Sequence, residues 1–259
     1  MEISKIILKE SRSLNAVEPF KIEVQERLQP FTLKNMYLEA EFGVDGLLTS
    51  VSIEGKRFPL ATRFYTYSTR RGQSMSGAYL FLPDGTARVM AIGSNHYVRI
   101  IQGSIRSQVV VHMPQLVHQV TMHHSPGVDG VGLQMDNLVN LSGQNNMEVA
   151  MRFETNLQSG KAFYTDLNGL QMTRRERFDK LPLQAHFYPM PTMAYIEDNT
   201  ARLTLASGQP LGVASLKSGQ LEVMLDRRLN QDDNRGLGQG RIFYLIDFNF
   251  NFMNTMSNF

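Results

Sequence analysis

EVAMRFET, residues 148–155, alternates apolar with polar side chains, so that Val149, Met151 and Phe153 share one face of an extended chain. The same alternation recurs in two other stretches, ARLTLAS (201–207) and QLEVMLD (220–226). Side chains of a strand point alternately to its two faces, so this period of two predicts strands with one buried face. Turn dipeptides such as Asp-Gly and Asn-Gly separate the runs. The sequence therefore predicts an all-β fold, an antiparallel β-sandwich.

Composition limits the class of protein. Of the 259 residues, 42% are apolar and 19% are charged, which suffices for one large domain or two small ones. The 26 basic and 24 acidic side chains give a net charge of +2, so we expect no nucleic-acid partner. Without cysteine the chain forms neither a disulfide nor a thiolate metal site. We also expect no signal peptide and no membrane anchor in this sequence.

The charged stretch LDRRLNQDDNRGLGQG (225–240) is a first candidate for a catalytic site. A glycosidase needs two carboxylates that face one sugar ring from about 5 to 9 Å apart. Asp232 and Asp233 are adjacent, and neighbours on an extended chain point to opposite faces, so they are poorly placed for this role. We therefore expect a loop after a strand that ends near Leu229, in which the aspartates cap backbone amides and hold arginines.

The histidines do not indicate a metal site. Of six histidines, His112 and His118 have an even spacing that would place both on one face of a strand, but no acidic residue lies close to them. We expect them to be incidental surface or loop residues. The GxSxG, HExxH, P-loop and dinucleotide-binding motifs are also absent.

Tyr79 lies in SGAYLFLPDG (76–85), where Leu80, Phe81 and Leu82 predict a buried strand closed by a Pro-Asp-Gly turn. A tyrosine at this position can belong to the core, or its phenol can project into a cleft and form hydrogen bonds. The residues leave both alternatives open. They also leave two classes of function: a carbohydrate- or protein-binding sandwich, and part of an enzyme whose chemistry lies elsewhere.

Long blocks of this sequence resemble the C-terminal half of the α-mannosidases of glycoside hydrolase family 38. The blocks are SGAYLFLPDG (76–85), FYTDLNGLQMTRRERFDKLPLQAHFYPMPTMAYIED (163–198), RLTLASGQPLGVASLKSGQLEVMLDRRL (202–229) and DDNRGLGQG (232–240). The resemblance starts near residue 35, where NMYLEAEFGVDGLLTSV is similar to the start of the family's large β-domain. KLPLQAHFYPMPTMAYIED and RGLGQG make the chain more similar to the Golgi type, mannosidase II, than to the lysosomal type.

The resemblance implies the C-terminal domain of a zinc-dependent retaining α-mannosidase, which trims mannose from N-glycans in the Golgi lumen. In that family the aspartate nucleophile and the zinc ligands lie in an N-terminal α/β barrel and the helices after it, a catalytic domain that this chain lacks. The domain implied here is a galactose-mutarotase-like supersandwich, truncated at its C-terminus. It would pack on the catalytic domain and complete the cleft that binds a mannose-containing N-glycan.

By motif, the family's cleft tyrosine falls on Tyr79 and its active-site arginine falls on Arg235. A phenol offers a sugar hydroxyl both a donor and an acceptor, and a guanidinium can orient carboxylates near the nucleophile. Asp232 and Asp233 would support the loop that presents the arginine.

The resemblance divides the chain into three parts. Residues 1–34 would be the end of a preceding small β-domain or a linker, residues 35–240 the β-sandwich domain, and residues 241–259 a non-family tail. Because the nucleophile and the zinc ligands are missing, we expect the chain alone to be inactive as a mannosidase. The alternatives are a stand-alone carbohydrate-binding module and an inert β-sandwich fragment.

Overall fold

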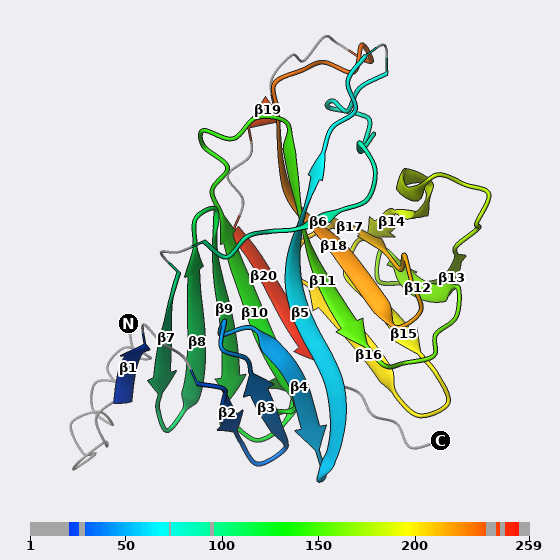
Figure 1. Cartoon of the computed structure of the whole chain (residues 1–259). Helices are drawn as coiled ribbons and strands as arrows, with labels where there is room; N and C mark the ends of the chain where they lie inside the picture. Colours follow the sequence, from blue (N-terminus) through cyan, green and yellow to red (C-terminus); the bar gives the residue numbers. More distant parts are fainter. Residues whose placement is uncertain are drawn as a thin grey trace, which may run out of the picture.

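Two β-sheets face each other and enclose one apolar core (Figure 1). The described strand pairs are all antiparallel, which confirms the predicted antiparallel β-sandwich. No helix among the described residues is long and apolar enough to cross a membrane. This computed structural model describes the backbone of residues 21–25, 29–72, 74–93, 96–236, 242–243 and 247–253, and side chains within 29–236.

The first sheet has the order β1-β7-β8-β9-β10-β20-β16-β15-β12-β13. Its strands are β1 (Lys21–Gln25), β7 (Tyr97–Gln102), β8 (Arg106–Met113), β9 (Leu116–His123), β10 (Gly132–Val139), β12 (Ala162–Leu167), β13 (Gln171–Glu176), β15 (Met193–Glu197), β16 (Arg202–Ser207) and β20 (Asp247–Met253). The backbone of β20 pairs with β10 on one side and with β16 on the other, so it joins the two halves of the sheet. A 3-10 turn, η1 (Val128–Val131), precedes β10.

The second sheet has the order β14-β17-β18-β11-β5-β4-β3-β2, with β19 paired to β18 and β6 paired to β5. Its strands are β2 (Phe31–Lys34), β3 (Leu38–Phe42), β4 (Leu48–Ile53), β5 (Lys56–Ser68), β6 (Arg88–Val89), β11 (Met147–Thr155), β14 (Tyr188–Met190), β17 (Leu211–Ala214), β18 (Gln220–Leu229) and β19 (Ile242–Phe243). The 3-10 turn η2 (Leu183–His186) leads into β14. Residues 1–20, the predicted domain boundary at 240 and most of the predicted tail lie outside the described residues.

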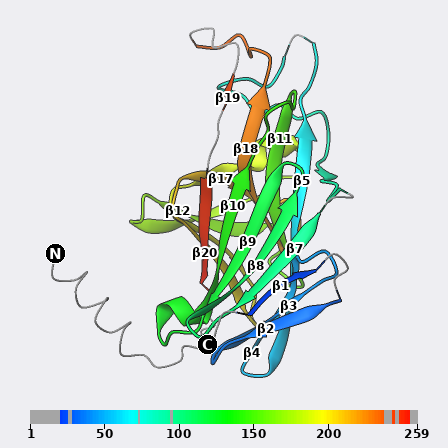
Figure 2. The same ribbon diagram turned by 90° about the vertical axis from the view of Figure 1, so that its left-hand side faces the viewer.

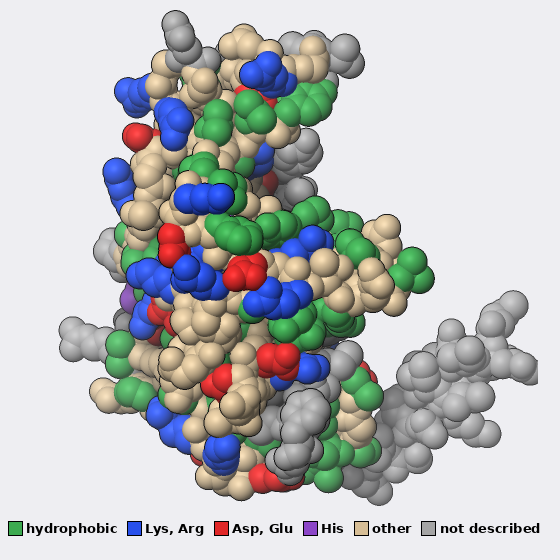
Figure 3. All heavy atoms as spheres, turned by 90° about the vertical axis from the view of Figure 1, so that its right-hand side faces the viewer, with side chains coloured by type: hydrophobic (Ala, Val, Ile, Leu, Met, Phe, Trp, Pro, Cys, Tyr) green, Lys and Arg blue, Asp and Glu red, His purple; other side chains and the backbone are tan. Residues whose placement is uncertain are grey.

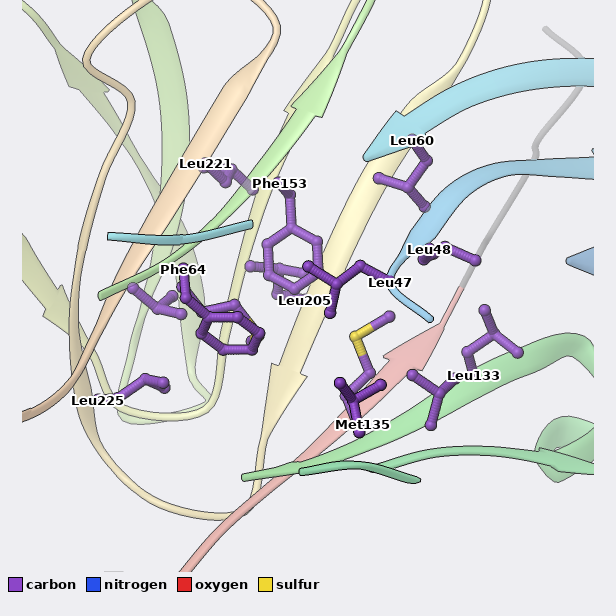
Figure 4. Close-up of a cluster of buried hydrophobic side chains, with 14 of the residues drawn as sticks. Leu47, Leu48, Leu60, Phe64, Leu133, Met135, Phe153, Leu205, Leu221 and Leu225 are labelled. Atoms are coloured by element: carbon purple, nitrogen blue, oxygen red, sulfur yellow. The ribbon is translucent and has the colours of Figure 1, made fainter. Parts of the chain in front are cut away.

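The stretch EVAMRFET forms β11, in the interior of the second sheet. Met151 lies opposite Phe64 of β5 on one side and Val223 of β18 on the other. Its predicted apolar face is buried, and Figure 4 shows Phe153 projecting from β11 toward Leu205 of β16 in the facing sheet. The predicted alternation is therefore confirmed, because the apolar side chains of both sheets meet in one layer between them.

A predicted turn at Asn168-Gly169 connects β12 and β13. Both residues have positive φ, 50° and 74°. Two consecutive left-handed residues form the tight hairpin turn whose twist matches that of the flanking strands, and asparagine followed by glycine adopts it at low cost. The dipeptide therefore fixes the register in which β12 pairs with β13.

His118 corrects one prediction, because it is neither a surface nor a loop residue. It lies within β9, is fully buried, packs edge-on against Phe64 and shares a 2.8 Å hydrogen bond with Asn137 of β10. Its position in LVHQVTMH places it on the same face as the buried Val120 and Met122. A histidine in that pattern is buried with the strand when a neighbouring strand offers one polar partner.

Burial lowers the pKa of His118 from 6.5 to about 4, although the bond to Asn137 opposes this. Below pH 6.5 His118 therefore binds a proton in the unfolded chain but not in the folded chain. As a result, the free energy of unfolding falls as the pH drops toward 4. We expect the titration of His118 to lower the free energy of unfolding by about 2 kcal/mol between pH 7 and pH 5. Urea unfolding of His118→Gln and of the unchanged chain at both pH values measures the effect; an identical pH dependence would contradict it.

Candidate functional site

Two loops far apart in the sequence meet at one end of the sandwich, at the top of Figures 1 and 2: residues 76–82 and 231–236. Asp233 Oδ2 accepts the backbone amides of Tyr79 at 2.8 Å and Leu80 at 2.9 Å, across 154 and 153 residues of sequence. Gln231 Nε2 donates to the carbonyl of Ser76 at 3.1 Å. The fold thus brings the predicted site residues Tyr79, Asp233 and Arg235 together.

The predicted buried strand at 80–82 is wrong, because these residues form a loop. Their backbone amides donate hydrogen bonds to side chains and not to a neighbouring strand. The amide of Leu80 donates to Asp233, and that of Leu82 donates to Ser76 Oγ at 2.8 Å. Next to this loop, Thr69 and Pro83 form an isolated antiparallel β-bridge. The apolar run still has a packing role, since Phe81 lies edge-on against Tyr67 and Phe187.

Tyr79 is not a core residue. The residue is 56% exposed, and its ring lies over Gly236 in the second loop. A Cβ on Gly236 would come within 2.4 Å of the ring, and the φ of +62° at that glycine also disfavours other residues. Glycine here lets the phenol lie against the loop with its remaining surface open to solvent.

The two aspartates bond to backbone amides. Asp232 Oδ1 accepts from Asn234 at 2.9 Å, and Asp233 Oδ1 accepts from the amide of Arg235 at 3.0 Å. Burial acts to raise the pKa of Asp233, but its bonds to the amides of Tyr79, Leu80 and Arg235 outweigh that effect and hold the pKa below its usual value. The carboxylate is therefore a fixed anchor for both loops. Arg235 itself stands at an exposed position in this loop.

A buried ion pair behind the loops was missed in the sequence. Arg227 of β18 donates through Nη2 to the carboxylate of Glu148 on β11 and, at 3.0 Å, to the carbonyl of Leu80. Burial raises the pKa of Glu148 to about 7 even though Arg227 opposes it. The signal was available, since Glu148 and Arg227 are opposite charges at facing positions of paired strands. The Leu80 contact follows only from the fold.

Among the described residues, no three histidine, aspartate or glutamate side chains converge on a point that could hold a metal ion. The carboxylates near the loops are bonded to amides or to Arg227. The exposed residues of this braced pair of loops include Tyr79 and Arg235, whose phenol and guanidinium can bind and orient a polar ligand.

Gly77 sets the distance between the two loops. A Cβ there would lie 2.4 Å from the backbone nitrogen of Asp233. We expect Gly77→Ala to lower the free energy of unfolding by about 1–3 kcal/mol, because the loops must separate. Hydrogen exchange at the amides of Tyr79 and Leu80 should speed up as Asp233 withdraws. Gly212→Ala is the matched control, since its Cβ would meet nothing closer than 3.8 Å; equal effects of both changes would refute the argument.

Comparison with known proteins adds the decisive observation. The model of the C-terminal domain of family 38 glycosyl hydrolases matches residues 33–235. This chain belongs to glycosyl hydrolase family 38. The family 38 domain described here therefore carries the two-loop site at one end of its β-sandwich.

Relatives of this domain agree with the predicted type. It is 44% identical over 211 residues to alpha-mannosidase 2 of Homo sapiens and 47% identical over 201 residues to that of Drosophila melanogaster. It is 28% identical over 226 residues to lysosomal alpha-mannosidase of Cavia porcellus. The predicted similarity to the mannosidase II type is thus confirmed. The matches cover 81%, 77% and 80% of this chain but only 18%, 18% and 22% of the relatives, about a fifth of their length.

Solved structures share the fold. A family 38 glycosyl hydrolase from Enterococcus faecalis has a TM-score of 0.62 at 13% identity, over 92% of this chain and 31% of that chain. An alpha-mannosidase from Enterococcus faecalis V583 also has a TM-score of 0.62, at 11% identity, over 89% of this chain and 30% of its own.

Proposed function

We propose that this domain completes the substrate cleft of a zinc-dependent retaining α-mannosidase that trims mannose from N-glycans in the Golgi lumen. The observation that carries the proposal is the joining of Tyr79 to the loop that bears Arg235, within a domain 44% identical to an alpha-mannosidase 2. The substrate is then a mannose-containing N-glycan, and the partner is the catalytic domain of the same enzyme.

In this proposal Tyr79 and Arg235 support a cleft whose catalytic residues lie elsewhere. The phenol can donate a hydrogen bond to one sugar hydroxyl and accept one from another. The guanidinium is permanently charged and planar, so it can orient a carboxylate but cannot act as a base. Asp233 keeps both residues in place through the amides of Tyr79 and Arg235. The described residues offer no set of zinc ligands, so the zinc and the nucleophile would come from the catalytic domain.

The whole enzyme provides the main test. We expect Tyr79→Phe and Arg235→Lys each to lower kcat/KM for an α-mannoside by about 10-fold, because each change removes a polar contact at the cleft wall. Tyr97→Phe and Arg88→Lys make the same exchanges on other elements, β7 and β6, and should leave activity unchanged. Equal kcat/KM for the site and control variants would reject the assignment of the two residues.

The isolated chain provides a second test. With added zinc and a chromogenic α-mannoside it should show no turnover, since nucleophile and acid/base are absent by family analogy. Turnover that disappears in Arg235→Ala would refute this. Glycan-array binding by the isolated chain that is lost in Tyr79→Ala would support the alternative of a carbohydrate-binding module.

A further inference from the structure

A pocket of about 460 Å³ lies on the outer face of the second sheet, beneath the segment 177–187 that links β13 to β14. Tyr67 of β5, Arg152 of β11 and Gln220 of β18 line it from the sheet, and His186 lines it from the linking segment. Figure 3 shows the side of the molecule on which this segment lies, where basic and hydrophobic side chains stand next to one another. The volume is within the range of about 300–1,000 Å³ that is typical of small-molecule sites.

Polar side chains of the sheet form a rigid floor for this pocket. The buried Glu222 accepts the hydroxyl of Tyr67 through one oxygen and Nε and Nη2 of Arg152, at 2.6 and 2.5 Å, through the other. The guanidinium of Arg152 also lies over the ring of Tyr65, 3.7 Å from its centroid. Burial raises the pKa of Tyr67, so its hydroxyl keeps its proton. These contacts hold the floor in one arrangement before any ligand arrives.

Two buried polar atoms in the lining residues have no hydrogen-bond partner within the described part of the chain: Nδ1 of His186 and Oε1 of Gln220. His186 is only 4% exposed. Native proteins rarely leave such atoms without a partner, so each needs a ligand or a water. Oε1 requires a donor, whereas Nδ1 can donate or accept according to its tautomer. Both atoms lie beneath the pocket surface, so a ligand reaches them only when the side chains of His186 and Gln220 turn toward it. A hydroxyl group, which both donates and accepts, would then satisfy either atom.

The pocket mouth has an excess of positive charge. Arg177 and the exposed Lys217 line it, and Arg177 is held by a bond from Nη1 to the carbonyl of Leu216. The one acidic side chain in the lining, Asp179, is bonded to Lys161 at 2.5 Å, so its charge is already matched. The exposed ring of Phe178 adds an apolar wall. We propose that this pocket binds a small hydroxylated anion, an acidic or phosphorylated monosaccharide.

Calorimetric titration of the full chain in about 0.1 M salt tests the proposal with three sugars that differ at one carbon. D-Glucuronate carries a carboxylate there, D-glucose 6-phosphate carries a phosphate, and D-glucose is uncharged, so the two charged arms distinguish the kinds of anion. We expect at least one charged sugar to bind at least about 10-fold more tightly than D-glucose, because charge-assisted bonds strengthen recognition. No binding by either charged sugar, or equal binding by D-glucose, would overturn the proposal.

Paired charge reversals locate the binding. Lys217→Glu should lower the affinity for the charged sugar by at least about 10-fold, because it replaces an attractive charge at the pocket mouth with a repulsive one. Lys180→Glu makes the same change on the exposed segment beside the pocket but outside its lining, and should leave the affinity unchanged. Tyr79→Phe should also leave it unchanged. Equal effects of the two lysine changes would overturn the assignment of this pocket.

Discussion

Arg152→Met is expected to lower the free energy of unfolding by about 3–5 kcal/mol. Arg152 and Glu222 form an ion pair whose side chains are 13% and 1% exposed, so the change would leave a carboxylate buried without its cation. Burial raises the pKa of Glu222 although Arg152 opposes this, so the surroundings disfavour the charged carboxylate. Urea unfolding at pH 7, monitored by circular dichroism, gives the free energy directly.

Arg63→Met is the matched control for this prediction. Arg63 lies opposite Arg152 on β5 and pairs with Glu154 at 3.8 Å, but its side chain is 44% exposed. An exposed pair contributes little, so we expect a loss below about 1 kcal/mol. Adding Glu222→Gln to Arg152→Met should recover part of the stability, because the buried charge is then gone. Equal losses for the two arginine variants would show that the pair is not effectively buried.

Leu205→Ala is expected to cost about 2–5 kcal/mol of unfolding free energy. Leu205 is 1% exposed on β16 and lies in the layer between the sheets, where Figure 4 shows it beside Phe153 of β11. Removing its isobutyl group takes apolar contacts from both sheets at once and leaves a cavity that their paired strands cannot close. Chemical unfolding of the purified chain measures the loss.

Leu170→Ala provides the comparison for the core substitution. Leu170 is 89% exposed in the turn between β12 and β13, so the same chemical change removes almost no buried contact. We expect its effect to stay within about 0.5 kcal/mol. If the two leucine variants unfolded at the same urea concentration, the layer around Leu205 would not be the stabilising core.

The sequence predicted the strands well where one face is buried. In β11 and β18 the alternation placed the apolar residues correctly, and β18 ends at Leu229 as expected. The strand prediction was wrong where side chains, and not a partner strand, accept the backbone hydrogen bonds. Leu80 to Leu82 have the composition of a buried strand, but Asp233 and Ser76 take their amides. The prediction of a surface or loop position for His118 was wrong for a related reason. Its hydrogen-bond partner Asn137 lies on another strand, and the sequence alone does not show that the two residues are neighbours.

By itself the sequence determined the class of fold and the family, and it proposed Tyr79, Asp232, Asp233 and Arg235 as candidate site residues. Periodicity and turn chemistry are local properties, and the similarity to relatives is a property of residue order. Only the tertiary structure decided that Asp233 would bond to the amides of Tyr79 and Leu80, and that a pocket would form where three strands meet the segment before β14. Both arrangements depend on contacts between residues far apart in the chain, and such contacts follow from how the sheets pack and not from any local pattern.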